Sequence, residues 1–176
     1  MLVPALESSK ALLRLVSSAW PKGATRDIFD LIVYRVAQPP AGLDAIAVPH
    51  EGPLASFRGF APGEPLLVSG YPGEDKRIDS DKSEVQTGRA FMDAAYVCLP
   101  DPKEPAFHQL RWTDAAAAAS VEGMSGGPVL RPTETGDFEL VGVLTQGGPT
   151  SAPAHFLDVR VLREVLDLDF NNNPHE

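Results

Sequence analysis

The chain has 176 residues, a length typical of one domain or of two small halves packed together. Hydrophobic residues make up 43% of it, and 15 Lys and Arg against 24 Asp and Glu give a net charge of −9. An acidic surface repels phosphate backbones and anionic lipids. We therefore expect neither nucleic-acid binding nor a role at a membrane surface.

Glycine and proline are abundant, with 15 and 17 residues respectively, which favours short strands joined by turns over a helix bundle. The single cysteine, Cys98, excludes an intrachain disulfide. No stretch is long and apolar enough to span a membrane. The first twenty residues carry Glu7, Lys10 and Arg14 and do not resemble a secretory signal, so the expected location is the cytoplasm.

The predicted elements, in chain order, are mostly short strands. The segment 10–20 fits a strand or a helix, and its periodicity does not decide between them. Residues 28–36 form a β-branched, apolar run typical of a buried strand, and the breaker cluster at 38–42 predicts a linker. Further strands are expected at 66–69, 84–91, 94–99, 107–112, 127–130 and 138–145. Many short strands at fairly regular spacing indicate a β-sandwich or barrel.

The end of the chain has a different pattern. Over 159–168, apolar residues recur at helical spacing and charged residues occupy the opposite face, which predicts an amphipathic helix. A polar tail, 171–176, follows it.

The most informative stretch is 122–130, Glu-Gly-Met-Ser-Gly-Gly-Pro-Val-Leu. Glycine at 123 permits backbone conformations barred to other residues, so the N–H groups of Gly123 and Ser125 can converge on a developing oxyanion. Gly126 and Gly127 are expected to leave room for a substrate. The alternative is a glycine-rich hairpin with an incidental serine.

The same stretch also satisfies the Gly-x-Ser-x-Gly elbow of α/β-hydrolases, in which an acid and a histidine follow the serine. Asp137 with His155, or Asp158 with His175, would supply that order. The elbow must lead into a helix, however, and the prolines at 128 and 132 oppose one.

The string Gly-x-Ser-Gly-Gly-Pro resembles the nucleophile motif of the trypsin-like (chymotrypsin-fold) serine peptidases, bacterial type. The resemblance extends over roughly residues 28–168: Asp30 and its following aliphatic run look like the aspartate strand, 141–147 like the pocket strand, and 153–159 like the last strand. It implies a mainly β protein, a trypsin-like double β-barrel with an incomplete first barrel, a complete second barrel and a C-terminal helix. The implied divisions are 1–38 (remnant of the first barrel), 39–53 (linker), 54–170 (second barrel plus helix) and 171–176 (disordered tail).

The resemblance also implies a set of site residues. Ser125 would be the nucleophile and Asp30 its supporting acid, with Asp27 as the fallback, and the N–H groups of Gly123 and Ser125 would form the oxyanion hole. The substrate pocket would have Ala119 at its base and Thr145, Gly147 and Ala154 in its walls, which suits a small or medium uncharged side chain. Met124 stands where many secreted members have an aspartate that binds a newly cut N-terminus, so this chain resembles bacterial members that need no such activation.

One departure from the family pattern bears on activity. The family's general-base histidine precedes the aspartate, but none of the 29 residues before Asp30 is a histidine. His50 is interpreted as a loop residue, His155 as a neighbour of the pocket strand, and His108 and His175 as surface residues. Without an imidazole a serine hydroxyl is a weak nucleophile, so we expect a serine endopeptidase-type domain that is inactive as this chain.

Three explanations remain open: a coding sequence that starts upstream, a degenerate pseudoprotease, and a histidine supplied by another chain. A rival function is a non-catalytic peptide- or protein-binding module that uses the same cleft. The expected partner is a peptide or protein substrate, with no metal and no cofactor. The apolar strand at 28–36 also predicts self-association, or binding of a partner, through residues 10–36.

Overall fold

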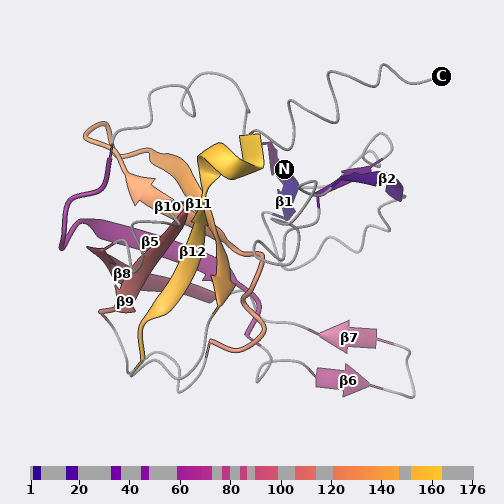
Figure 1. Cartoon of the computed structure of the whole chain (residues 1–176). Coiled ribbons are helices and arrows are strands. Elements are labelled where there is room, and N and C mark those ends of the chain that lie inside the picture. The colour runs from indigo at the N-terminus through magenta and orange to yellow at the C-terminus, as the bar shows by residue number, and fades with distance from the viewer. Residues whose placement is uncertain are drawn as a thin grey trace.

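The computed structural model describes residues 2–4, 15–19, 33–36, 45–47, 59–72, 77–79, 84–86, 90–98, 106–113, 121–146 and 152–163. Its main feature is a closed, antiparallel barrel of six strands in the order β10-β11-β12-β9-β8-β5 (Figure 1). These strands are β5 (Pro65–Gly70), β8 (Ala90–Cys98), β9 (Phe107–Trp112), β10 (Pro128–Pro132), β11 (Phe138–Gln146) and β12 (Ala154–Asp158). The expected mainly β barrel is confirmed.

Side chains alternate between the inside and the outside of the barrel, as period-2 strands require. In β9, for example, His108, Leu110 and Trp112 are buried, while the residues between them are half-buried or exposed. The inward residues form one apolar core, which includes Leu66, Val68, Met92, Ala94, Leu110, Val129, Val141, Leu144, Ala154 and Phe156.

The barrel closes where β10 pairs with β5. The register there places Val129 opposite Val68 and Leu130 opposite Leu67. Closure joins segments that lie far apart in the sequence, and it removes the free strand edges that an open sheet would expose.

Two tight turns shape the end of the barrel at which β5 begins. The sequence Ala61-Pro62-Gly63-Glu64 forms a turn in which the Glu64 N–H donates to Ala61 O at 2.9 Å, and Gly63 has φ 82°. Proline second and a positive-φ glycine third are the residues of a type II turn. Between β10 and β11, the residues 133–137 turn with Gly136 at φ 85°.

The other described strands form three two-stranded antiparallel sheets. β1 (Leu2–Pro4) pairs with β4 (Ala45–Ala47), β2 (Leu15–Ala19) with β3 (Val33–Val36), and β6 (Arg77–Asp79) with β7 (Glu84–Gln86). β2 settles the conformation of part of the 10–20 segment as a strand, and β4 lies inside the expected linker 39–53. In Figure 1 the β6–β7 pair stands away from the barrel.

Most barrel strands match their predictions within two residues, and 107–112 matches at both ends. The division into strands at 84–91 and 94–99 was wrong: β7 ends at Gln86, and β8 runs without a break from Ala90 to Cys98. The physical reason is Asp93, which is exposed on the outer side of β8 between the buried Met92 and Ala94. A charged residue there continues the alternation instead of ending the strand.

A helical turn over 159–163 directly follows β12, which confirms the start of the predicted C-terminal helix. The rest of that prediction, 164–168, and the tail 171–176 lie outside the described residues. Within the described part of the chain, no helix has the length and apolar character needed to cross a membrane.

Candidate active site

Ser125 lies in a double turn that precedes β10. The Met124 N–H donates to Val121 O at 3.1 Å, and the Gly127 N–H donates to Met124 O at 2.9 Å, so two consecutive four-residue turns share Met124. The third residue of each is a glycine with positive φ, Gly123 at 89° and Gly126 at 88°. Side chains rarely adopt this conformation, which explains the glycine at both positions.

The double turn is hydrogen-bonded to β11 near the end of that strand. The Gly126 N–H donates to Leu144 O at 2.7 Å, and the Leu144 N–H donates to Gly127 O at 2.8 Å. The Ser125 hydroxyl donates to Thr145 O at 3.2 Å, and the Ser125 side chain is exposed. The barrel therefore holds the serine at its surface on a fixed backbone.

Two amides of the double turn have no hydrogen-bond acceptor among the described residues. The N–H groups of Met124, Gly126 and Gly127 all donate within the turn or to β11, whereas among the described residues those of Gly123 and Ser125 have no acceptor. Both residues are exposed. Two donors without acceptors next to a hydroxyl are what is needed to stabilise the oxyanion that forms on a carbonyl oxygen when the hydroxyl adds to the carbonyl carbon.

Gly127 has a different role from the one expected from the sequence. A Cβ there would lie 2.2 Å from Ser69 O and 2.8 Å from Met124 O. The position needs glycine because the turn backbone packs directly on the end of β5.

The structure describes part of the expected pocket. Thr145 is half-buried, and its hydroxyl donates to His155 O at 3.2 Å. Ala154 is buried and belongs to the barrel core. The hydrogen bond from the Ser125 hydroxyl to Thr145 O places Thr145 next to Ser125. The other expected site residues, Asp30 with its fallback Asp27, Ala119 and Gly147, lie outside the described residues, as do His50 and His175.

His155 is half-buried on β12, opposite Gln146 of β11. The Gln109 side-chain amide donates to His155 Nε2 at 3.4 Å. The other ring nitrogen, Nδ1, is buried and has no hydrogen-bond partner in the described part of the chain. The described contacts of His155 therefore do not include Ser125.

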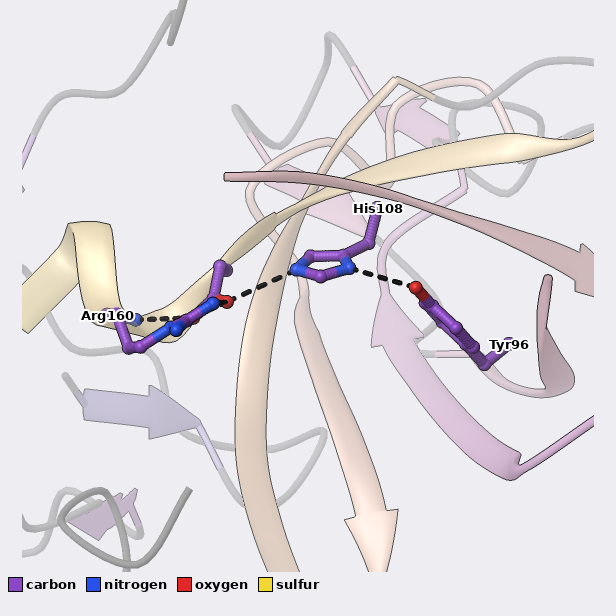
Figure 2. Close-up of polar contacts among 4 residues, drawn as sticks. Tyr96, His108 and Arg160 are labelled. Atoms are coloured by element: carbon purple, nitrogen blue, oxygen red, sulfur yellow. Dashed lines mark hydrogen bonds and ion pairs between the residues drawn. The ribbon is translucent and has the colours of Figure 1, made fainter. Parts of the chain in front are cut away.

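His108 is buried, not a surface residue as the sequence suggested. It is 4% exposed and packs between aromatic rings, stacked on Phe156 at 5.1 Å and edge-on to Phe60 at 4.7 Å. Its ring belongs to a buried hydrogen-bond network: Nδ1 lies 3.4 Å from the Tyr96 hydroxyl, and Nε2 lies 3.2 Å from Asp158 Oδ2. Figure 2 shows His108 in this network between Tyr96 and Arg160.

Asp158 connects the barrel interior with the helical turn. Its Oδ1 accepts the Arg160 backbone N–H at 2.8 Å, the contact of a helix N-cap, and its Oδ2 accepts Arg160 Nε at 2.9 Å. Burial alone would raise the pKa of the Asp158 carboxyl, but the hydrogen bonds from His108 and Arg160 outweigh burial and lower it. The group is therefore ionised at neutral pH.

The pKa of the Tyr96 hydroxyl is raised, first by burial and then by the neighbouring Cys98 and Asp158. Tyr96 consequently keeps its proton and can donate it to His108 Nδ1. The His108 Nε2–H then donates to the Asp158 carboxylate, so the Tyr96, His108 and Asp158 side chains each have a hydrogen-bond partner.

The sequence contained a signal that His108 and Asp158 are buried. His108 has the same alternation as Leu110 and Trp112, and Asp158 the same as Ala154 and Phe156, so each falls on an inward face. The polarity of a histidine indicates a surface residue, whereas the place of His108 in the strand indicates a buried one.

None of the described hydrogen bonds of Tyr96, His108 or Asp158 reaches Ser125. Asp158 lies three residues along β12 from His155, a distance on the order of 10 Å in a strand. The described hydrogen bonds of its carboxylate go to His108 and to Arg160. Among the described residues, no histidine forms a hydrogen bond with Ser125.

A comparison with solved structures matches the chain to kallikrein-related peptidase 10, in a complex with Zn2+. The TM-score is 0.55 and the sequence identity 14%, and the match covers 92% of this chain and 74% of that chain. No protein-family model matches the sequence, and no curated protein matches it. The likeness shows the fold, which is that of the trypsin-like serine peptidases. Because β10 follows the Ser125 turn, the helix that an α/β-hydrolase elbow requires is absent at that point of the structure.

Proposed function

We propose that the chain is a serine endopeptidase-type domain whose Ser125 turn binds the carbonyl end of a peptide. The observation that carries this proposal is that, among the described residues, Gly123 N–H and Ser125 N–H have no acceptor and lie beside an exposed hydroxyl on a turn that is hydrogen-bonded to the barrel. The trypsin-like fold of the chain adds support to the proposal.

In the proposed chemistry, Ser125 Oγ forms a bond to the carbonyl carbon, and the π electrons of the C=O bond move to the oxygen. The Gly123 and Ser125 amides stabilise that oxyanion. The hydroxyl proton must leave at the same time, and the C–N bond breaks only when the amine nitrogen receives a proton. A histidine normally performs both transfers.

Because no histidine precedes Asp30 in the sequence, we propose that this chain binds peptides at Ser125 and turns them over poorly or not at all. Loss of the serine or the histidine of a triad costs on the order of 10⁶ in turnover. Binding of a carbonyl or carboxylate by the two amides needs no base and would persist.

The test combines a binding and a reactivity measurement. Tetrapeptides ending in alanine, valine or leucine, each with a free carboxylate, are titrated into ¹⁵N-labelled chain. A fluorophosphonate probes whether Ser125 reacts. We expect the amide signals of Gly123 and Ser125 to shift with peptide and no stoichiometric labelling.

Rapid labelling that Ser125→Ala abolishes would show that the chain has a competent base, and the inactive part of the proposal would be wrong. Peptide binding that leaves the Gly123 and Ser125 amides unmoved would instead favour a pseudoprotease that binds its partner elsewhere. If no peptide binds, the site assignment itself fails.

A further inference from the structure

Met124 occupies the junction of the two turns that carry the unused amides. Its N–H closes the first turn and its C=O accepts the bond that closes the second. The two free donors, Gly123 N–H and Ser125 N–H, belong to the residues directly before and after it. Any rotation of the backbone at Met124 therefore changes the angle between these donors.

The Met124 side chain is inside the barrel although its neighbours face solvent. It is 1% exposed, and with Val121 it is one of two turn side chains in the apolar core. Glu122, Gly123, Ser125 and Gly126 are all exposed. The turn is thus held to the core by apolar packing at its central residue.

Gly70, the last residue of β5, receives this side chain. A Cβ at Gly70 would lie 2.9 Å from Met124 Cβ, 3.0 Å from Cγ and 3.1 Å from Cε. Met124 therefore lies along the Gly70 backbone, one residue beyond Ser69, whose carbonyl touches Gly127. The missing side chain at 70 and the long side chain at 124 are complementary in volume.

We infer that Met124, packed on Gly70, is a positioning residue that keeps the Gly123 and Ser125 amides aimed at one point. This inference rests on the proposed function and extends it. The anchor carries no charge, so apolar packing and not an ion pair holds the residue between the two donors. A rigid donor pair binds a negative oxygen better than a pair that must first be ordered.

The experiment measures how strongly the site prefers an anion. For each variant, the dissociation constants of one tetrapeptide with a C-terminal carboxylate and of the same peptide with a C-terminal carboxamide are determined, and their ratio is taken. The ratio cancels contacts along the rest of the peptide. In Met124→Ala we expect the preference for carboxylate to fall by about 10-fold or more, since displacement of about 1 Å is costly at such sites.

A matched control separates positioning from general stability. Met92 on β8 is 2% exposed in the same core, so Met92→Ala removes the same side chain and lowers the melting temperature while leaving the ratio unchanged. Gly70→Ala should lower the ratio because the new Cβ displaces Met124. In the double variant Gly70→Ala/Met124→Ala the added methyl occupies part of the space left by Met124, and part of the preference should return.

The outcomes keep the two proposals apart. An unchanged ratio in Met124→Ala, or an equal loss in Met92→Ala, would overturn the positioning role while peptide binding by the wild type stands. A wild type with no preference for carboxylate and no shift of the two amides would overturn the proposed function itself. If Met124→Ala fails to fold by circular dichroism, Gly70→Ala, which keeps the methionine, decides by the same ratio.

Discussion

Nε2 of His108 and Oδ2 of Asp158 lie 3.2 Å apart inside the barrel, with side-chain exposures of 6% and 1%. The two residues come from β9 and from the end of β12, fifty positions apart in the sequence. Because Asp158 also caps the helical turn, one carboxylate connects two barrel strands and the C-terminal element. Several expectations follow from this double attachment.

Replacing Asp158 with alanine should destabilise the protein strongly. The change leaves the His108 Nε2–H in the core without an acceptor and removes the N-cap, so we expect the free energy of unfolding to fall by about 3 kcal/mol. Urea denaturation measures the effect. Asp93→Ala, at an exposed position on β8, is the matched control and should change the same quantity by less than about 0.5 kcal/mol. Equal effects of the two variants would contradict the structural role of Asp158.

The contribution of Asp158 should depend on pH in one direction. Its pKa is lowered in the folded state, so the unfolded state binds the proton more tightly, and the stabilisation is present above the unfolded pKa of about 4. It is lost as the pH falls through the folded pKa. We expect the difference in unfolding free energy between the wild type and Asp158→Asn to be constant between about pH 5 and pH 7 and to shrink below about pH 4. A difference that persists unchanged at pH 2.5 would show that the carboxylate charge contributes nothing.

Arg131 provides a second buried charge whose partners can be removed singly. Its side chain is 2% exposed, with Nη2 donating to Glu139 Oε2 at 2.7 Å and Nη1 lying 3.7 Å from Glu64 Oε1. Glu139→Ala should lower the free energy of unfolding by about 3 kcal/mol, because a buried guanidinium loses its main acceptor. The exposed Glu134 in the adjoining turn is the control, and its alanine variant should have little effect. Comparable melting temperatures for both variants would refute the assignment.

Two glycines near the two ends of β10 should respond differently to alanine. Gly136 has positive φ and open space around its missing Cβ, so Gly136→Ala should cost only the backbone strain of roughly 1–2 kcal/mol. Gly127→Ala places a methyl 2.2 Å from the Ser69 carbonyl, which belongs to a barrel strand and cannot move aside, and should cost more than about 2 kcal/mol. Urea midpoints rank the two variants, and the reverse order would contradict the packing of the turn on β5.

The sequence predicted a β-sandwich or barrel because its strands are short and are bounded by turn residues, and the family resemblance favoured the barrel. The 107–112 strand and the Ser125 turn are the clearest examples, since each is determined by neighbours in the sequence. Asp93 shows a limit of this approach: a charged residue can sit on the outer side of a strand without ending it, and the boundary depends on which side faces water.

What the sequence could not show is which residues meet across the barrel. The pairing of His108 with Asp158, and the fit of Met124 on Gly70, depend on the strand order β12-β9 and on the approach of the turn to β5. Neither fact is encoded in local periodicity. The assignments of Asp30, Ala119 and Gly147 come from the family resemblance and stay predictions.

The seam between β10 and β5 has a consequence for the order of folding. Strands β8 and β9 are neighbours in the sequence and can pair early, whereas β10 reaches β5 only after a long loop has closed, which is slow. The Ser125 turn leads directly into β10 and rests on Ser69 and Gly70 at the end of β5. We therefore expect the Ser125 turn to form in the last folding step, so that in pulsed hydrogen exchange the Gly126 and Leu144 amides gain protection after those of the β8–β9 pair. A newly synthesised chain would then lack the proposed oxyanion site until its barrel has closed.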